Sequence, residues 1–190
     1  MNIEVKQMIN KILEDEIRQT FMSVTWSHKI QEKQAELCYK KYKIWEVVRI
    51  VSSALTTVGL FSLIFSNKLI VKIISAILSL IITFISMMFK SFNLQEMSVR
   101  HKSTANKLLI IRDKLRTLLV EIHLDMKDDV ILLNNYKELQ KELHGIYNEA
   151  PNTTKKAVDE ARIALKIKED NKFSDEEIDK NLPKNLRYGG

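Results

Sequence analysis

Two long apolar runs dominate the hydrophobic pattern of the chain. Residues 50–67 carry no formal charge over 18 positions, residues 73–89 carry none over 17, and Lys68 and Lys72 lie between the runs. With their flanks, residues 47–66 and 69–89 each reach the roughly 17–25 residues that a helix needs to cross a bilayer. One continuous span is excluded, because about 40 helical residues would extend to roughly twice the hydrocarbon thickness. The pattern predicts a transmembrane hairpin within residues 46–90.

A buried helical hairpin in a soluble protein is the alternative interpretation of these runs. Helices that are apolar on all sides do occur in the cores of large proteins, but a chain of 190 residues encloses few elements so completely. A lysine at the centre of a spanning helix would cost about 2.5–3.5 kcal/mol, so Lys68 and Lys72 belong at the ends of their helices. Lys72 can extend its ammonium to the headgroups. We therefore favour the membrane.

Amphipathic periodicity predicts helices on both sides of the hairpin. Residues 2–18 form one such helix, a bend is expected within residues 20–27, and a helix from His28 runs into the first span. After the second span the helix is expected to continue, because positions spaced by three and four form a coiled-coil seam over about four heptads. The seam consists of Leu94, Met97, His101, Thr104, Leu108, Ile111, Leu115, Leu118 and Ile122. We expect a stalk that packs on residues 28–45 and extends the hairpin into the cytoplasm.

The C-terminal part continues the helical pattern and then becomes polar. A helix is expected over residues 129–148, ending before Pro151, and a second over residues 155–168. Residues 171–190 read as a polar, mobile tail. The predicted fold is all-α, with N-terminal cytoplasmic helices (1–45), the hairpin (46–90), a C-terminal cytoplasmic helical module (91–170) and the tail.

Composition supports an all-helical protein and gives the hairpin an orientation. The chain has four Gly, two Pro and one Cys, so an intramolecular disulfide and a cysteine-based zinc site are excluded. The flanks of the hairpin hold ten Lys/Arg and the loop holds two, Lys68 and Lys72. By the positive-inside rule both termini lie in the cytoplasm, so we expect a multi-pass membrane protein.

The net charge of +6 is unevenly distributed along the chain. Residues 125–190 carry 12 Lys/Arg and 14 Asp/Glu, whereas residues 1–124 carry 18 and 10. The positive charge therefore surrounds the hairpin, which suits an anionic lipid bilayer better than a nucleic-acid groove. We expect no direct binding of nucleic acid.

No enzyme motif is found in the sequence. Glycine-rich phosphate loops, the zinc-protease motif and the serine-hydrolase elbow are all missing, so we expect no catalytic residue, no metal site and no cofactor. His101, on the stalk seam, is interpreted as a packed or register-setting residue.

Small polar residues form stripes within both predicted spans. Ser75, Ser79, Thr83 and Ser86 share one face of the second helix, and Ser52, Thr56 and Gly59 share a face of the first. We favour close helix packing as their role. The alternative is a weakly polar pore lining in an oligomer, and the two roles are compatible. The spans lack acids, Arg and His, which argues against a coupled transporter.

Several features together carry a family resemblance. The amphipathic segment 106–122 (NKLLIIRDKLRTLLVEI) follows the hairpin, and after an acidic turn comes segment 136–165 (YKELQKELHGIYNEAPNTTKKAVDEARIAL). Within it, Ile146-Tyr147-x-x-Ala150-Pro151 precedes an alanine-rich helix. Over roughly residues 1–170 the chain resembles the SLATT family, the SMODS- and SLOG-associating two-transmembrane effector domains of prokaryotes.

The resemblance implies a function that the residue pattern alone does not reach. It implies an effector of anti-phage or anti-plasmid conflict that forms a homo-oligomer and permeabilises the inner membrane. Activation would come from a second-messenger nucleotide or from a companion polymerase or nucleotidyltransferase system. The rival hypothesis is a membrane anchor or scaffold that recruits a partner enzyme without permeabilising the bilayer.

Overall fold

The prediction of an all-α fold is confirmed by the computed structural model, which describes residues 3–65, 69–170, 173–183 and 187. Every regular element within these residues is a helix. In chain order the helices are α1 (Ile3–Phe65), α2 (Leu69–Phe92), α3 (Leu94–His123), α4 (Asp129–Glu149), α5 (Lys155–Lys166) and α6 (Asp175–Asn181).

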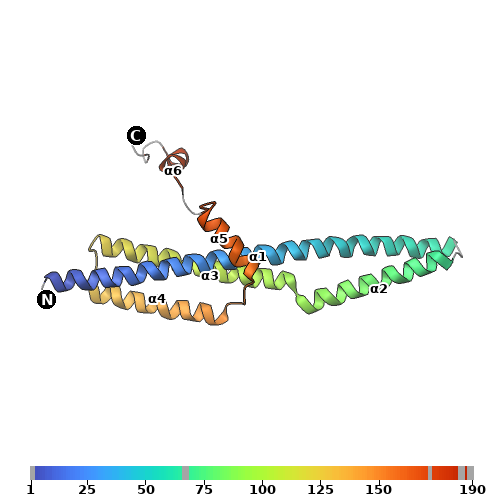
Figure 1. Ribbon diagram of the computed structural model, residues 1–190, viewed down its shortest axis with the longest axis horizontal. Helices are drawn as coiled ribbons and strands as arrows, with labels where there is room; N and C mark the ends of the chain where they lie inside the picture. The colour runs from blue at the N-terminus through green and yellow to red at the C-terminus, as the bar shows by residue number, and fades with distance from the viewer. Residues whose placement is uncertain (1–2, 66–68, 171–172, 184–186, 188–190) are drawn as a thin grey trace.

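Helix α1 forms the long axis of the molecule (Figure 1). Its 63 residues make a rod about 95 Å long. The bend expected within residues 20–27 is wrong, because α1 is continuous there. Val24 is fully buried in the core, and the Thr25 hydroxyl donates to the Phe21 carbonyl at 2.8 Å. Packing of this face and a satisfied hydroxyl outweigh the low helix propensity of β-branched residues.

The first part of α1 packs with α3 and α4 in a three-helix bundle. Partners across α1 and α3 run in opposite directions: the Ser98 hydroxyl donates to the Ala35 carbonyl at 2.9 Å, and further along α3 His101 meets Gln31. The bundle core contains Leu13, Ile17, Val24, Leu108, Ile111, Leu115, Leu118, Leu132, Tyr136, Leu143 and Ile146. Helix α3 therefore packs on α1 as a stalk, but not along the expected residues 28–45 alone: the core residues of α1 are Leu13, Ile17 and Val24, because the antiparallel 30-residue α3 extends back along α1. Helix α4 is a third helix of this bundle.

Helix α2 is separated from α3 by one residue. Asn93 adopts a left-handed conformation (φ 32°, ψ 53°), and its side chain accepts a hydrogen bond from the Glu96 amide at 3.3 Å. The expected continuous helix is therefore wrong at this point. Asparagine tolerates the left-handed region better than other residues with a Cβ and also caps helices well. The pair Asn93 and Glu96 was a sequence signal for this start.

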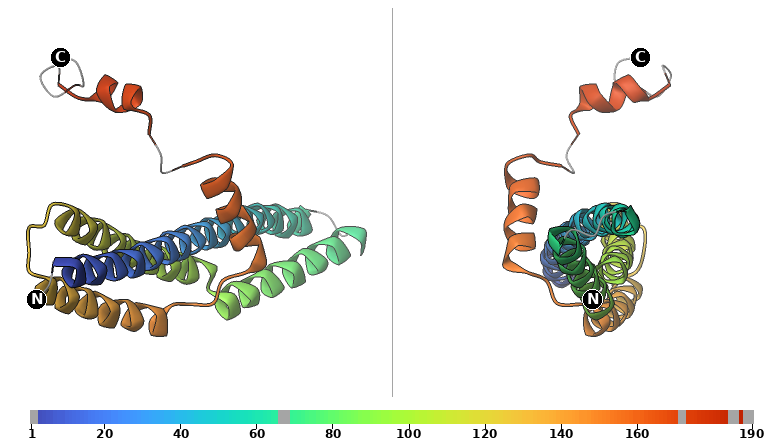
Figure 2. Two further views of the ribbon diagram at one scale, coloured as in Figure 1. Left: turned by 60° about the vertical axis from the view of Figure 1, so that its left-hand side comes forward. Right: turned by 90° about the vertical axis from the view of Figure 1, so that its right-hand side faces the viewer.

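Helix α5 lies across α1 near the middle of the rod, and α6 stands apart from the bundle (Figure 2). Five residues without regular structure, 150–154, connect α4 to α5, and Pro151 is the second of them. Ala157, Ala161 and Ala164 of α5 are buried, and α5 contacts α1. Small side chains on this face let the two helices approach closely.

Candidate membrane segment and polar junction

Helix α2 contains a segment that is long and apolar enough to cross a membrane. This segment, Leu69–Met87, has 19 residues, a mean hydropathy of 2.5 and only 11% of its residues buried. Leu80 and Phe84 are 71% and 63% exposed. A core helix of a soluble protein would be mostly buried, so the alternative of a buried soluble hairpin does not fit α2.

The first predicted span remains a prediction. Residues 47–66 extend beyond the end of α1 at Phe65, and residues 66–68 lie outside the part of the chain that the structure describes. The described apolar side chains before that point are exposed, including Ile50 at 58% and Leu55 at 52%. Among the described residues, Leu69–Met87 is the one segment that meets the criteria for a span.

The face of α2 that contacts α1 differs from the predicted hydroxyl stripe. The least exposed residues of this part of α2, spaced alternately by four and three, are Val71, Ser75, Leu78, Ile82 and Ile85. Ser75 is 4% exposed and belongs to both sets. Ser79, Thr83 and Ser86 are exposed, so α1 does not cover them.

The stripe on α1 is described only in part. Ser52 and Thr56 are half-buried, whereas Gly59 lies outside the residues whose surroundings the structure describes. The Thr56 hydroxyl donates to the Ser52 carbonyl at 3.0 Å, and the Thr83 hydroxyl of α2 donates to the Ser79 carbonyl at 2.9 Å. Hydroxyls bonded in this way are satisfied without water, so these threonines are compatible with lipid or with another helix.

The structure buries most of the predicted stalk seam. His101, Thr104, Leu108, Ile111, Leu115 and Leu118 are buried, together with Ala105. Leu94, Met97 and Ile122 are half-buried, at the two ends of the seam. The central part of α3 therefore faces α1 and α4 as the spacing predicts.

A polar layer separates the apolar bundle core from the exposed part of α1. We call Gln31, Gln34 and His101 the glutamine–histidine layer. His101 is completely buried and both glutamines are 7% exposed. The atoms His101 Nδ1 and Gln31 Oε1 lie 2.6 Å apart, which joins α3 to α1.

The hydrogen bonds of Gln31 determine the tautomer of His101. The Gln31 amide nitrogen donates to the Pro151 carbonyl at 3.2 Å, so its oxygen faces the imidazole and Nδ1–H is the donor. Nε2 is buried and has no hydrogen-bond partner among the described residues. Burial, and secondarily the charge of Arg100, lower the pKa of His101 below its usual value of 6.5. The imidazole is therefore neutral at pH 7.

The second glutamine of the layer holds the start of α5. Gln34 Oε1 accepts from the Thr154 amide at 2.9 Å and from the Thr154 hydroxyl at 2.7 Å. Thr154 also caps α5, because its hydroxyl accepts from the Ala157 amide at 3.4 Å. Sequence reasoning did not single out these glutamines. Their partners are 120 residues away, and the available signal was two uncharged amides one turn apart on a stalk helix.

An ion-pair cluster borders the layer. The Glu32 carboxylate of α1 forms ion pairs with Lys29 at 3.0 Å and with Lys102 of α3 at 3.2 Å. Burial alone would raise the pKa of Glu32, but the two ammonium groups lower it below its usual value. Burial lowers the pKa of His28, against the opposing charge of Glu32. A charged carboxylate and two neutral imidazoles therefore lie within this part of the stalk.

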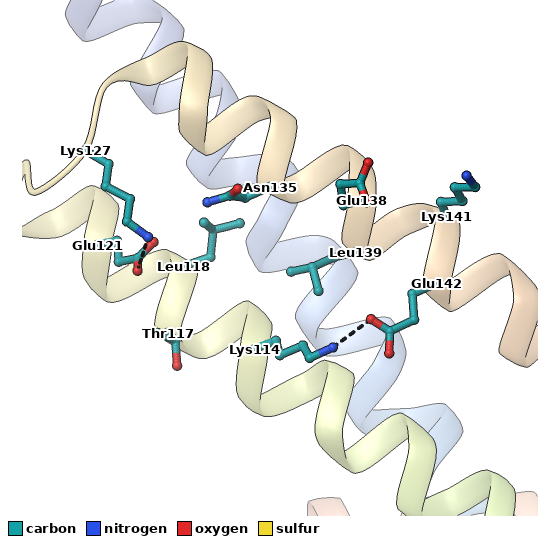
Figure 3. Close-up of a pocket in the computed structure, with 10 residues that line it drawn as sticks. All are labelled: Lys114, Thr117, Leu118, Glu121, Lys127, Asn135, Glu138, Leu139, Lys141 and Glu142. Carbon is teal, nitrogen blue, oxygen red and sulfur yellow. Dashed lines mark hydrogen bonds and ion pairs between the residues drawn. The ribbon is translucent and has the colours of Figure 1, made fainter.

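The cavity between α3 and α4 is charge-balanced (Figure 3). Its volume is about 710 Å³. Lys114 contacts Glu142 across the two helices at 2.7 Å, and Lys127 contacts Glu121 at 2.6 Å. Three lysines and three glutamates line it in total, so this cavity offers no excess of either charge to a ligand.

Comparison with known proteins assigns a family to most of the chain. A family model described as SMODS and SLOG-associating 2TM effector domain family 4 matches residues 13–177, which reach from α1 into α6. No curated protein and no solved structure that was compared matches the chain.

Proposed function

The chain belongs to SMODS and SLOG-associating 2TM effector domain family 4, and we propose that it assembles in the inner membrane into a homo-oligomer that permeabilises the bilayer. Family membership makes it a two-transmembrane effector domain associated with SMODS and SLOG defence systems. The proposal requires no catalytic residue, in keeping with an effector family.

One observation carries the proposal: three hydroxyl-bearing residues of α2 are exposed on a largely apolar helix. Ser79, Thr83 and Ser86 lie outside the α1 contact, so in a single chain they would face lipid. Small and hydroxyl-bearing residues favour close approach between membrane helices. Copies that pack through this stripe would bring several hydroxyls together, and a single hairpin cannot enclose a channel. The stripe therefore supports assembly as a condition of function.

The path from the bundle to the membrane segment is short. Helix α3 joins α2 through Asn93 alone, while its other end packs in the bundle core. A nucleotide signal or a partner protein that shifts α3 against α1 would change the position of α2. We propose that activation acts by this route.

Replacing Ser79 or Thr83 by Leu tests the role of the stripe. We expect inducible expression of the wild-type chain, once activated, to admit a membrane-impermeant dye and depolarise the cells. The leucine variants should insert equally but admit dye several-fold more slowly, because a bulky apolar side chain prevents close packing of the hydroxyl faces.

The matched control is Ile77→Leu, which changes an exposed residue on the opposite side of α2 by helical period. It should leave dye entry unchanged. Activated cells that stay polarised and dye-tight contradict the pore. Full activity of Ser79→Leu and Thr83→Leu contradicts a role for the stripe.

A scaffold function is favoured by a separate observation at the membrane-distal end. Leu124 and Met126, between α3 and α4, and Val130 and Ile131 at the start of α4 are 51–67% exposed. Such a patch is typical of a protein interaction site. Replacement of Met126 and Ile131 by Ser should release a recruited enzyme from membranes while dye entry stays absent throughout, if anchoring is the function.

A further inference from the structure

A second cavity lies where α1, α3 and α5 meet. Its volume is about 520 Å³, which is within the range of small-molecule sites. Its lining includes Phe21 and Trp26 from α1, Arg112 and Arg116 from α3, Lys166 from α5 and one carboxylate, Glu169. Unlike the cavity between α3 and α4, this one has a clear excess of positive charge.

One cation of this cavity lies over an aromatic ring, and two more line the cavity from α3. Lys166 Nζ lies 5.8 Å from the centroid of the Trp26 ring. The Arg112 guanidinium is oriented by Asp113, whose Oδ1 accepts from Nε at 3.2 Å and from Nη2 at 2.9 Å. Arg116 is one helical turn further along the same face of α3. Aromatic and guanidinium planes of this kind stack on flat rings, and Arg and Lys bind phosphate oxygens.

We propose that this cavity binds a nucleotide, whose base stacks on Trp26 and whose phosphates bind Arg112, Arg116 and Lys166. This inference rests on the proposed function, for which it supplies the site of activation. Stacking and phosphate contacts are sequence-independent ways to bind nucleotides, and both sets of groups are present in one cavity.

The position of the cavity distinguishes a soluble ligand from a lipid headgroup. Trp26 precedes the first predicted span, which begins at residue 47, by 21 positions of one continuous helix. That separation is about 30 Å along α1. A phospholipid headgroup cannot reach across such a distance, so the phosphate must belong to a ligand in the cytoplasm.

Occupancy of the cavity would be communicated to the stalk through α5. A nucleotide would join Lys166 of α5 to the arginines of α3. Thr154, at the start of α5, donates hydrogen bonds to Gln34. In the segment before α5, the Pro151 carbonyl accepts a hydrogen bond from Gln31. A ligand that binds one arrangement of α3 and α5 more tightly stabilises that arrangement by mass action.

Tryptophan fluorescence of the full chain in detergent tests the site directly. The chain has two tryptophans, so Trp45→Phe leaves Trp26 as the single reporter. Titration with ATP, GTP, cyclic AMP and cyclic di-AMP should give saturable quenching with at least one of them. Adenosine alone and pyrophosphate alone should bind at least about tenfold more weakly, because each offers only half of the contacts.

Charge-neutralising variants localise the binding. Arg116→Gln combined with Lys166→Gln should weaken nucleotide binding by at least about tenfold, since two charge-assisted contacts are lost. The matched control, Lys114→Gln with Arg162→Gln, removes the same charge from α3 and α5 outside the cavity and should bind normally. Absence of saturable quenching by all four nucleotides, or equal affinity in the two double variants, overturns the site.

Binding and permeabilisation are read out separately. Nucleotide binding without dye entry would retain the site and refute the pore, whereas dye entry without binding would retain the pore and refute the site.

Discussion

At the scale of single residues, burial keeps the His101 imidazole from taking up a proton. Its imidazole is completely buried, it donates through Nδ1 to Gln31, and its Nε2 has no acceptor among the described residues. Protonation would place a charge and an additional unsatisfied donor in a site that already excludes water. The cost of that state lowers the pKa of His101.

The stability of the bundle should therefore fall with acidification. The unfolded chain holds its histidines near a pKa of about 6.5, so below that pH the unfolded state binds protons first. The stabilisation is complete above the unfolded pKa and is lost as pH falls towards the lower folded pKa. The melting midpoint, measured by circular dichroism in detergent, should fall less between pH 7.5 and pH 5.5 for His101→Gln than for the wild type.

The exposed His123 of α3 provides the control for this comparison. His123→Gln should keep the wild-type pH dependence. The pKa of His28 is also lowered, so the melting midpoint of His101→Gln should still fall somewhat on acidification. An identical pH dependence for wild type and His101→Gln would exclude His101 as a source.

The sequence predicted the buried residues of α3 better than their partners. Leu108, Ile111 and Leu115 follow the heptad spacing, and burial of a helix face depends mainly on that local periodicity. Gln31 and Gln34 could not be found in this way. Their role depends on Pro151 and Thr154, and a polar contact between distant segments leaves no periodic signal.

At the scale of elements, Asn93 decides where α2 ends and α3 begins. The left-handed conformation interrupts the helix, while the side chain caps the next one at the Glu96 amide. Periodicity extended the seam back to Leu94 but could not indicate the break, because a single residue outside the helical region leaves the spacing of its neighbours almost unchanged. The bend expected in α1 failed for the opposite reason, since core packing overrides a local propensity.

Replacing Asn93 tests both of its roles. Asn93→Ala removes the cap and places an ordinary side chain in the left-handed region, so it should lower the free energy of unfolding by about 1–3 kcal/mol. Asn93→Gly keeps the conformation and should cost only a few tenths of a kcal/mol. Denaturant unfolding in detergent measures both, with Asn134→Ala on the exposed face of α4 as the control. Equal stability of the alanine and glycine variants would contradict this account.

At the scale of the whole molecule, the arrangement separates a bundle at one end from the hairpin at the other (Figure 1). Core residues are concentrated in α1 before residue 39, in α3 and in α4. Most of the described apolar side chains of α2 are exposed, so lipid or other copies must cover them. The positive flanks of the hairpin then predict that the bundle lies in the cytoplasm.

Cysteine labelling tests this orientation. In a Cys38→Ser background, which removes the one native thiol, a cysteine at Lys68 in the predicted loop should react with a membrane-impermeant maleimide in intact cells. A cysteine at Lys114 of the bundle should react only after the membrane is opened. The reverse pattern would invert the predicted topology.

The continuity of α1 gives the two arms of the molecule unequal mechanical properties. Helix α1 is unbroken and about 95 Å long. A tilt of a few degrees therefore moves one end of α1 by several ångströms relative to the other end. Helices α2 and α3, by contrast, can change their relative angle, because they meet at a single left-handed residue, Asn93. A movement of the bundle relative to the bilayer should therefore bend the chain at Asn93, where α2 can change its angle to α3 while α1 stays straight.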